Sequence, residues 1–353
     1  MFRGMTLMIA GLGTFLMTFA SAPQLRKLPS LPHAIAGQFV GAIDNTVVVA
    51  GGSWWTSPPD EGGVKMWDDR IQVLQQDSKS WQSIGQLPQP MAYGGALSLG
   101  HELVLAGGQN EDMVSSKVWS LKLNGRRFNL SSWPDLPNPL TNFSIAFAGN
   151  KIYVFGGQKE KNSLASASLW SLTIQPNGIP AAAWQQESPL PGKGRILAAA
   201  AGCGGRLYVV GGATLEKLPD GIAARHYLRE AWSYDPVNKW IRLPDPPTPS
   251  VAAPAVCAGG HSVLLIGGDD GHMDGVVLRP GEVHPGFSKV LTRYDAINKT
   301  WSEVGKLPLG LVTTGAAVLS DGRIVIPGGE DRPGSRSNVV LELSPSTKRR
   351  IIE

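Results

Sequence analysis

The stretch VVVAGG, Val47–Gly52, consists of four apolar residues followed by two glycines. A short apolar run rich in β-branched residues and bounded by turn residues is typical of a buried strand. The same pattern recurs five more times, at intervals of 49 to 61 residues. The further copies are LVLAGG (Leu103–Gly108), IYVFGG (Ile152–Gly157), LYVVGG (Leu207–Gly212), VLLIGG (Val263–Gly268) and IVIPGG (Ile324–Gly329). This period indicates a chain built from six copies of one supersecondary unit.

A tryptophan and then a Leu-Pro pair follow the two glycines in five of the six units. The tryptophans are Trp81, Trp133, Trp184, Trp240 and Trp301. The Leu-Pro pairs begin at Leu87, Leu136, Leu190, Leu243 and Leu307. Each unit thus holds four short strands, of which the second ends in Gly-Gly and the fourth carries the tryptophan. Radially repeated sheets of this kind resemble kelch propellers. We therefore predict an all-β fold, a six-bladed kelch β-propeller formed by residues 23–353.

The last unit lacks its tryptophan strand, and the start of the chain offers a replacement. Gln24–Pro29 aligns with the close of the other units, for example with Ser83–Pro88. An unpaired last blade would leave strand edges open. We therefore expect the N-terminal strand to complete the last blade and to close the ring.

Residues 1–22 have the pattern of a secretory signal peptide. A short basic start precedes an apolar run, Met5–Ala20, and a small-residue ending, Ala20-Ser21-Ala22. The alternative is a membrane anchor, but the run is shorter than the roughly 20 residues that span a bilayer. We predict cleavage after Ala20 or Ala22, a periplasmic or secreted protein, and no stable membrane anchor.

Composition excludes several other classes of partner. The net charge is +4, and no basic stripe is interleaved with aromatic residues, so we expect no nucleic-acid partner.

The chain has two cysteines, Cys203 and Cys257, which are too few for a disulfide framework. Export would allow their oxidation, but buried free thiols are the state we expect.

Loops after the Gly-Gly pairs and after the Leu-Pro pairs should emerge on one face, around the mouth of the central channel. Among the side chains that this places at the mouth are Trp54 and Trp55 in the first unit, and Asp269, Asp270 and His272 in the fifth. The acidic group could suggest a metal, but Asp-Asp-Gly-His is also ordinary turn chemistry, and further ligands at a usable spacing are lacking. We predict no metal site and no cofactor. The long segment from Asp269 to Ser288 could fold over the mouth as a lid.

The stretch PGGEDRPGSRSN, Pro327–Asn338, carries more charge than a turn requires. Glu330 directly follows Gly-Gly, so its carboxylate should face into the channel. Arg336 lies six residues on, and the Pro333-Gly334 turn should bring the two together. A partly desolvated glutamate can act as a general base, and an arginine can bind a carboxylate. A structural ion pair that braces the loop explains the pattern equally well.

The stretch Lys289–Leu343 resembles the bacterial N-acetylneuraminate epimerases, periplasmic kelch mutarotases that interconvert the anomers of sialic acid. The residues that carry the likeness are Tyr294-Asp295, Trp301, Thr314–Val318 and Gly329–Asn338. The last of these fits the family's Gly-Glu-x-x-Pro-Gly-x-Arg motif. The resemblance implies that Glu330 is the proton acceptor and that Arg336 lies in the site.

Two further stretches are similar to the same family. Pro191–Arg195 resembles its Pro-Gly-Gly-Pro-Arg, which implies that Arg195 helps Arg336 to hold the substrate carboxylate. Ala92-Tyr93-Gly94 also matches, and Tyr93, Trp54 or Trp55 should pack on the apolar face of the sugar. The Gly-Glu blade is the last one here, as in a cyclically permuted branch of the family, and a closed ring tolerates such a shift.

The sequence therefore predicts an isomerase that interconverts α and β N-acetylneuraminic acid, or a related acidic sugar, by carboxylate general-base catalysis. The expected partner is a small sugar, and a homodimer is left open. The alternative is a non-catalytic kelch propeller that binds a glycan or a protein. A Glu330–Arg336 pair inside a deep pocket would favour the enzyme, and a pair directed to solvent would favour the binding module.

Overall fold

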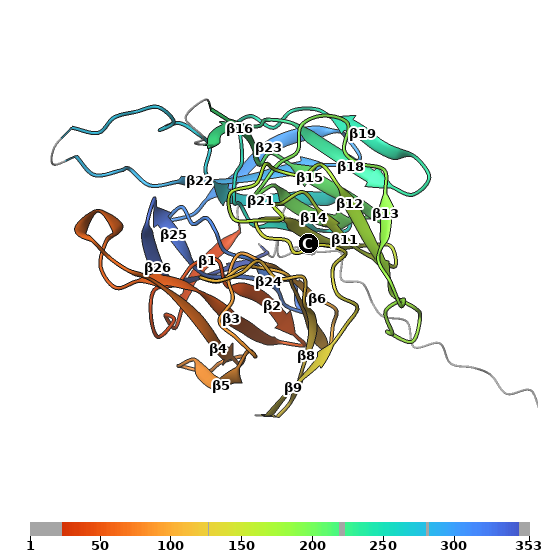
Figure 1. The fold of residues 1–353 in the computed structure, drawn as a ribbon, viewed down its shortest axis with the longest axis horizontal. Coiled ribbons are helices and arrows are strands. Elements are labelled where there is room, and N and C mark those ends of the chain that lie inside the picture. The colour runs from red at the N-terminus through yellow and green to blue at the C-terminus, as the bar shows by residue number, and fades with distance from the viewer. Residues whose placement is uncertain (1–22, 126, 219–222, 280–281, 346–353) are drawn as a thin grey trace, which may run out of the picture.

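The computed structural model describes residues 23–125, 127–218, 223–279 and 282–345. They form six antiparallel sheets of four strands each, which surround a central channel (Figure 1). Within the described residues the one helical element is a 3-10 turn at Pro59–Glu61. The six-bladed, all-β propeller predicted from the repeats is confirmed.

Each blade runs from an innermost to an outermost strand. Blade 1 contains β2 (Phe39–Ile43), β3 (Thr46–Trp55), β4 (Lys65–Leu74) and β5 (Gln82–Gln86). Blade 2 contains β6 (Gly95–Ser98), β7 (Glu102–Ala106), β8 (Val118–Asn124) and β9 (Arg127–Ser132). Blade 3 contains β10 (Ser144–Ala148), β11 (Lys151–Phe155), β12 (Leu169–Thr173) and β13 (Gln185–Glu187).

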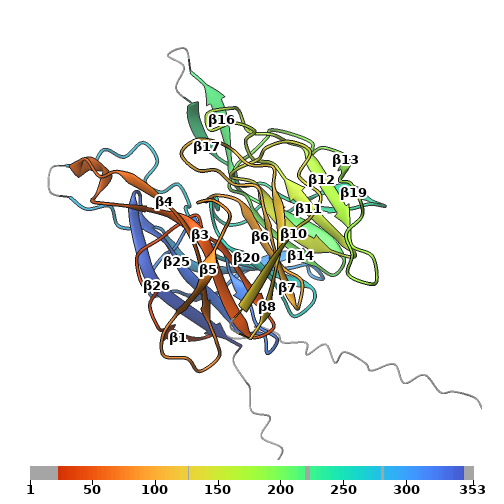
Figure 2. The ribbon, with the colours of Figure 1, turned by 60° about the horizontal axis from the view of Figure 1, so that its bottom comes forward.

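The second half of the ring carries the insertions. Blade 4 contains β14 (Ala199–Cys203), β15 (Arg206–Val210), β18 (Ala231–Asp235) and β19 (Lys239–Leu243). A hairpin of β16 (Ala213–Lys217) and β17 (Ala223–Tyr227) projects from this blade (Figure 2). Blade 5 contains β20 (Ala255–Ala258), β21 (Ser262–Gly268), β22 (Ser288–Asp295) and β23 (Thr300–Lys306). Blade 6 contains β24 (Ala317–Val318), β25 (Ile324–Arg332), β26 (Ser335–Ser344) and β1 (Gln24–Leu28).

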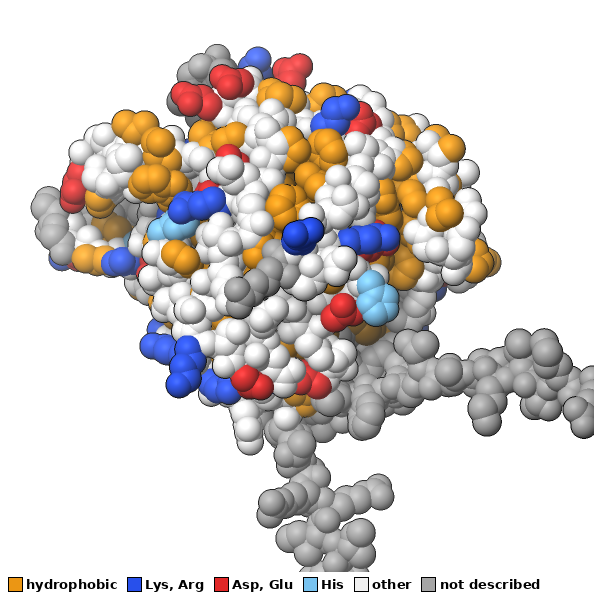
Figure 3. Space-filling model, turned by 90° about the horizontal axis from the view of Figure 1, so that it is seen from below, with side chains coloured by type: hydrophobic (Ala, Val, Ile, Leu, Met, Phe, Trp, Pro, Cys, Tyr) orange, Lys and Arg blue, Asp and Glu red, His pale blue; other side chains and the backbone are white. Residues whose placement is uncertain are grey.

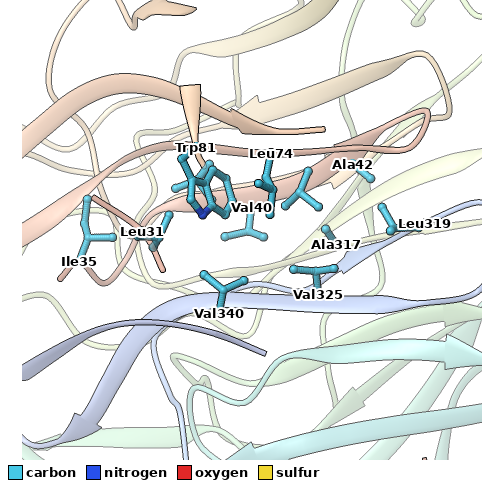
Figure 4. Close-up of a cluster of buried hydrophobic side chains, with 12 residues drawn as sticks. Leu31, Ile35, Val40, Ala42, Leu74, Trp81, Ala317, Leu319, Val325 and Val340 are labelled. Carbon is cyan, nitrogen blue, oxygen red and sulfur yellow. The ribbon is translucent and has the colours of Figure 1, made fainter. Parts of the chain in front are cut away.

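Strand β1 completes blade 6, as predicted. It pairs with β26 over five residues, from Gln24 opposite Ser344 to Leu28 opposite Val340. Behind this pairing, apolar side chains of blades 1 and 6 pack into one buried cluster (Figure 4). The labelled members are Leu31, Ile35, Val40, Ala42, Leu74, Trp81, Ala317, Leu319, Val325 and Val340. The two ends of the propeller are thus joined by a strand and by a shared core.

Four of the repeated tryptophans, in blades 1, 3, 4 and 5, each link their blade to the one before it. The indole N–H donates to a carbonyl oxygen that follows the outermost strand of the preceding blade, or lies near its end. The bonds run from Trp81 to Pro29 (2.8 Å), from Trp184 to Pro134 (2.9 Å), from Trp240 to Ser188 (2.8 Å) and from Trp301 to Pro244 (2.8 Å). Trp81 and Trp184 are buried, and a buried tryptophan N–H needs such a partner. All four bonds connect neighbouring blades.

A closed ring of backbone hydrogen bonds surrounds the channel mouth. One residue of each blade donates its N–H to the carbonyl of its counterpart in the preceding blade, over 2.7 to 3.0 Å. The six residues are Gly37, Tyr93, Asn142, Leu197, Ala252 and Thr313. Each has a positive φ, between 54° and 72°. Side chains rarely accept this conformation, so the ring holds five non-glycine residues in a strained but well-defined geometry.

The two cysteines form a disulfide, contrary to our expectation of free thiols. Cys203 ends β14 and Cys257 lies in β20, the innermost strands of blades 4 and 5. Adjacent innermost strands converge at the channel, so equivalent positions on neighbouring blades come close, here with 5.2 Å between the Cα atoms. That distance lies within the range that a disulfide requires.

The predicted signal peptide, residues 1–22, lies outside the described residues. Within the described part of the chain, no helix has the length and apolar character needed to cross a bilayer.

Candidate functional site

The residue after each Gly-Gly pair is fixed at the channel mouth. It exchanges two backbone hydrogen bonds with the loop that precedes the innermost strand of its own blade. For Gly-Gly pairs 1 to 6 these residues are Ser53, Gln109, Gln158, Ala213, Asp269 and Glu330. The two loop families therefore do share one face, and Glu330 is the blade 6 member of a ring of equivalent positions.

Glu330 and Arg336 form an ion pair across β25 and β26. The two residues lie opposite each other in the sheet, and Arg336 Nη1 is 2.5 Å from Glu330 Oε1. The N–H of Gly334 in the turn donates to Glu330 Oε2 at 3.3 Å. The side chains are 7% exposed for the arginine and 16% for the glutamate. The turn thus joins the two charges, as predicted, in a largely desolvated position.

Tyr93 connects this pair to the opposite side of the mouth. Arg336 Nη2 donates to Tyr93 Oη at 3.1 Å, and Tyr93 Oη lies 2.8 Å from Ser53 Oγ. The arginine can only donate, so Tyr93 Oη accepts from it, and either hydroxyl can donate in the Tyr93–Ser53 bond. One polar chain therefore runs through residues of blades 6, 2 and 1.

Gly37 makes the position of Tyr93 possible. It has a φ of +72°, and a Cβ atom built on it would lie 2.8 Å from Tyr93 Cε1. The tyrosine ring therefore packs on Gly37 of blade 1, where no side chain is in its way. Its hydroxyl can then reach Arg336 of blade 6.

Replacing Gly37 by alanine is expected to displace the Tyr93 ring and to destabilise the fold by about 2 kcal/mol, through the clash and the positive φ. Gly62→Ala is the matched control, because Gly62 also has a positive φ, +80°, but meets nothing within 4 Å. Urea unfolding of both variants separates the two causes. A Gly37→Ala variant no less stable than Gly62→Ala would show that the tyrosine does not depend on this space.

Lys65 and two tryptophans stand beside Tyr93, and the sequence did not single out Lys65. Cross-strand partners of β3 and β4 share a side of the hairpin, and the pairs Ser53–Trp67 and Trp55–Lys65 lie on the Tyr93 side. Lys65 Nζ is 4.4 Å from the Tyr93 ring centroid, 4.7 Å from that of Trp67 and 6.0 Å from that of Trp55. The sequence does contain a signal for this group. Alternate residues of a strand face the same side, so in Ser53–Trp55 and Lys65–Trp67 the first and third residues could have been predicted to lie together.

Trp54 belongs to the other side of the same hairpin. It pairs with Met66, and its ring lies against His33 in an edge-on arrangement with 6.5 Å between centroids. The two tryptophans expected to face the sugar are therefore separated, and Trp55 is the one that shares a group with Tyr93.

A cavity of about 190 Å³ occupies the channel mouth next to Tyr93. Its polar lining includes Gln38, Asn142, Ser144, Thr313 and Thr314. Gln38 Nε2 donates to Thr314 Oγ1 and to the Pro327 carbonyl, while its buried Oε1 has no partner among the described residues. The Gln38 amide is therefore held in place beside the cavity by its two donated hydrogen bonds.

Glu330 and Arg336 do not belong to the residues that line this cavity. The carboxylate is paired with Arg336 on the neighbouring strand instead of lining the cavity, so the expectation that it faces into the channel stays a prediction. The pair lies at the rim, one hydrogen bond beyond Tyr93, which does line the cavity.

Comparison with known proteins identifies the repeat. A family described as the KLHDC2/KLHL20/DRC7 Kelch-repeats domain matches residues 33–268 and, in a second register, 96–329. The chain belongs to the kelch-repeat family. The solved structure titled "Structure of YjhT" has the same fold, with a TM-score of 0.64 over 92% of this chain and 98% of that chain, at 15% identity.

Curated relatives of this kelch propeller include enzymes and a protein named only for its repeats. The N-acetylneuraminate epimerase of Haemophilus influenzae is 25% identical over 234 residues, which are 59% of this chain and 58% of that protein. Kelch-like protein 25 of Xenopus tropicalis is 29% identical over 65% of this chain and 35% of its own length. The chain thus spans less than two thirds of the length of these relatives. The resemblance to the epimerases is confirmed, and the shifted blade order stays a prediction.

Arg195 of the kelch propeller does not join the cluster at the rim. Its guanidinium is fully buried, with Nη2 2.7 Å from Glu230 Oε2 and Nη1 donating to the Gly211 carbonyl at 3.1 Å. Burial lowers the pKa of Arg195, and the hydrogen bond that it donates to Glu230 partly offsets this. The role expected for Arg195 in holding a substrate carboxylate is corrected, because the group is already paired inside blade 4.

His33, Asp68 and Arg70 form a second charged group near Trp54. Asp68 Oδ2 lies 2.8 Å from His33 Nε2 and 2.7 Å from Arg70 Nη2. Burial alone would raise the pKa of Asp68, but the hydrogen bonds from His33 and Arg70 outweigh it and hold the pKa well below its usual range. The carboxylate is therefore charged and committed to two partners.

Asp68 is expected to contribute to acid sensitivity. A carboxyl group whose pKa is lower in the folded state stabilises the fold above its unfolded pKa of about 3.9, and the contribution is lost as the pH falls toward the folded value. Asp68→Asn should therefore cost about 2 kcal/mol near pH 7, and its deficit should shrink below pH 4. Thermal unfolding of both proteins from pH 7 to pH 2 tests this. A deficit independent of pH would contradict it.

In the loop that follows the Gly-Gly pair of blade 5, Asp269 and Asp270 each contact a different partner. Tyr227 from the β16–β17 hairpin donates to Asp269 Oδ2 at 2.7 Å, and burial together with this bond raises the pKa of Tyr227 to about 12. Asp270 Oδ1 lies 2.5 Å from His272 Nδ1. The described residues hold no group of three or more side chains placed to bind a metal ion.

Proposed function

We propose that this kelch propeller interconverts the α and β anomers of N-acetylneuraminic acid, or of a related acidic sugar, without a cofactor. The observation that carries the proposal is the desolvated Glu330–Arg336 pair, which Tyr93 links to the cavity at the channel mouth. The epimerase relatives support it. The cavity volume, about 190 Å³, is small beside most ligand pockets and suits a single sugar ring partly open to solvent.

The chemistry requires one proton acceptor and one proton donor. Loss of the anomeric hydroxyl proton and protonation of the ring oxygen break the bond between the anomeric carbon and that oxygen. The open-chain keto acid then rotates and recloses on the other face. Glu330 is the acceptor in this proposal, for a sugar that extends from the cavity to the rim, and its protonated form then gives the same proton to the ring oxygen. The 2.5 Å contact with Arg336 fixes the direction of its carboxylate. Thr313 and Thr314 of the lining contact the sugar hydroxyls in this proposal.

Proton NMR tests the activity directly. The pure β anomer is dissolved, and the appearance of the α anomer is followed with and without protein. We expect the rate to rise in proportion to the protein concentration. A rate equal to that of buffer alone, with protein that is folded, would refute the proposal.

A binding module is the second candidate. The kelch-repeat match and the likeness to Kelch-like protein 25 concern the repeat and specify no activity. A non-catalytic propeller would bind a glycan or a protein at the same face and would tolerate the loss of Glu330. The NMR assay distinguishes the two functions, because only the enzyme changes the rate of anomer exchange.

Export from the cytoplasm is part of the proposal. The Cys203–Cys257 disulfide supports it, because disulfides persist mainly in oxidising compartments. A small sugar remains the proposed partner. On the face drawn in Figure 3, lysine and arginine side chains occur in small groups among acidic and neutral ones, which gives no support to a nucleic-acid partner.

A further inference from the structure

Some of the positively charged side chains near the channel mouth are already paired with a carboxylate, and one is not. Arg336 Nη1 is 2.5 Å from the Glu330 carboxylate, so this pair carries no net charge. Arg195 is buried against Glu230. Lys65 forms no ion pair with a carboxylate in the described parts of the chain, and its ammonium group contacts aromatic rings instead. An acidic ligand at this end of the channel therefore meets Lys65 as a cation without a counter-ion.

The aromatic rings hold the ammonium group in place without neutralising it. Tyr93 and Trp67 approach within 4.4 and 4.7 Å of Nζ, and Trp55 lies 6.0 Å away. Such cation–π contacts orient the lysine and lower the cost of ordering it. Trp55 Nε1 is buried and has no hydrogen-bond acceptor among the described residues.

Tyr93 places Lys65 and the proposed base around one ligand position. The ring face of Tyr93 contacts Lys65, its hydroxyl contacts Arg336, and the residue also lines the cavity. Lys65 does not itself line the cavity, so it lies, like the Glu330–Arg336 pair, one contact beyond Tyr93. Both groups are therefore next to the residue that a sugar at the cavity would contact.

We propose that Lys65 binds the carboxylate of the substrate, while Arg336 stays paired with Glu330. This inference rests on the proposed function, because it assigns the acid group of the same ligand. It replaces the carboxylate-binding role that the sequence predicted for Arg336 and Arg195. Lys65 thereby determines specificity for acidic over neutral sugars.

The test compares N-acetylneuraminic acid with its neutral methyl ester. Lys65→Met removes the charge but keeps a stem that packs on the rings, and Lys65→Arg restores the charge. Lys79→Met is the control, because Lys79 is an exposed lysine at the opposite end of blade 1. The dissociation constants of both ligands are measured by tryptophan fluorescence, and KM and kcat are measured by the NMR assay. Thermal unfolding confirms that the variants are folded.

For the acid, Lys65→Met should raise Kd and KM about 10- to 100-fold, as expected for loss of a charge-assisted hydrogen bond, with kcat little changed. The methyl ester should bind all variants alike, and Lys65→Arg should recover most of the affinity for the acid. Equal Kd values of wild type and Lys65→Met for the acid, or an equal loss for acid and ester, would overturn the role of Lys65. Lysine-dependent binding without any acceleration of anomer exchange would overturn the proposed mutarotase activity and leave the binding role supported.

Discussion

Glu330→Gln is expected to lower the protein-catalysed rate of anomer exchange at least about 100-fold, the usual contribution of a general base. Glutamine has the same shape and can still accept from the Gly334 N–H, but it cannot take the anomeric proton. The effect should fall on kcat, because the proposed anchor of the carboxylate is Lys65. The measurement is NMR exchange of N-acetylneuraminic acid at saturating concentration.

Asp269→Asn is the matched control for this variant. Asp269 occupies in blade 5 the position that Glu330 occupies in blade 6, with the same pair of backbone hydrogen bonds to the preceding loop. Its carboxylate accepts from Tyr227 rather than from an arginine. We expect its rate to stay within about threefold of wild type, in the range of surface substitutions outside a site. Unchanged exchange in Glu330→Gln would remove Glu330 as the base.

Removal of β1 should have the largest effect on stability. A chain that starts at Pro29 loses five strand-paired residues and the contact between Arg26 and Glu342, which lie 3.1 Å apart. Glu342 is buried and retains an ion pair with Arg323 and a 3.5 Å hydrogen bond from Ser344 Oγ. We expect a loss of about 3 kcal/mol from the missing hydrogen bonds alone, together with self-association through the open edge of β26.

A chain that starts at Pro23 and keeps β1 is the control for this truncation. Urea unfolding gives the free energies of both chains, and size-exclusion chromatography shows any association. Equal unfolding midpoints and equal elution volumes would mean that the ring does not depend on the N-terminal strand.

The sequence repeats were sufficient to predict the propeller and its closure. Each Gly-Gly pair marks the end of a buried strand near the channel, which is a local feature of the sequence. Six such strand ends predict six blades. Gln24–Leu28 could be assigned to blade 6 because its residues match the close of the other units. The contact of Glu330 with Arg336 could also be predicted, since a Pro-Gly turn joins two residues that face each other across one hairpin.

Other features of the site could not be predicted, because they depend on residues that lie far apart in the sequence. Tyr93 of blade 2 meets Arg336 of blade 6 because Gly37 between them leaves room for its ring. Arg195 looked like a ligand-binding residue in its Pro-Gly-Lys-Gly-Arg stretch, and only the tertiary structure shows it buried against Glu230. The disulfide depends in the same way on the convergence of two innermost strands at the channel.

The amino-acid sequence by itself thus determined the number of blades, the ring closure and the Glu330–Arg336 hairpin, because each depends on residues close together in the chain or on a repeated local pattern. The tertiary structure decided which side chains meet across blades. It separated Trp55 from Trp54 and placed Lys65 beside Tyr93. These contacts depend on the direction of each side chain and on the distance between neighbouring blades, and both are set only when the ring closes.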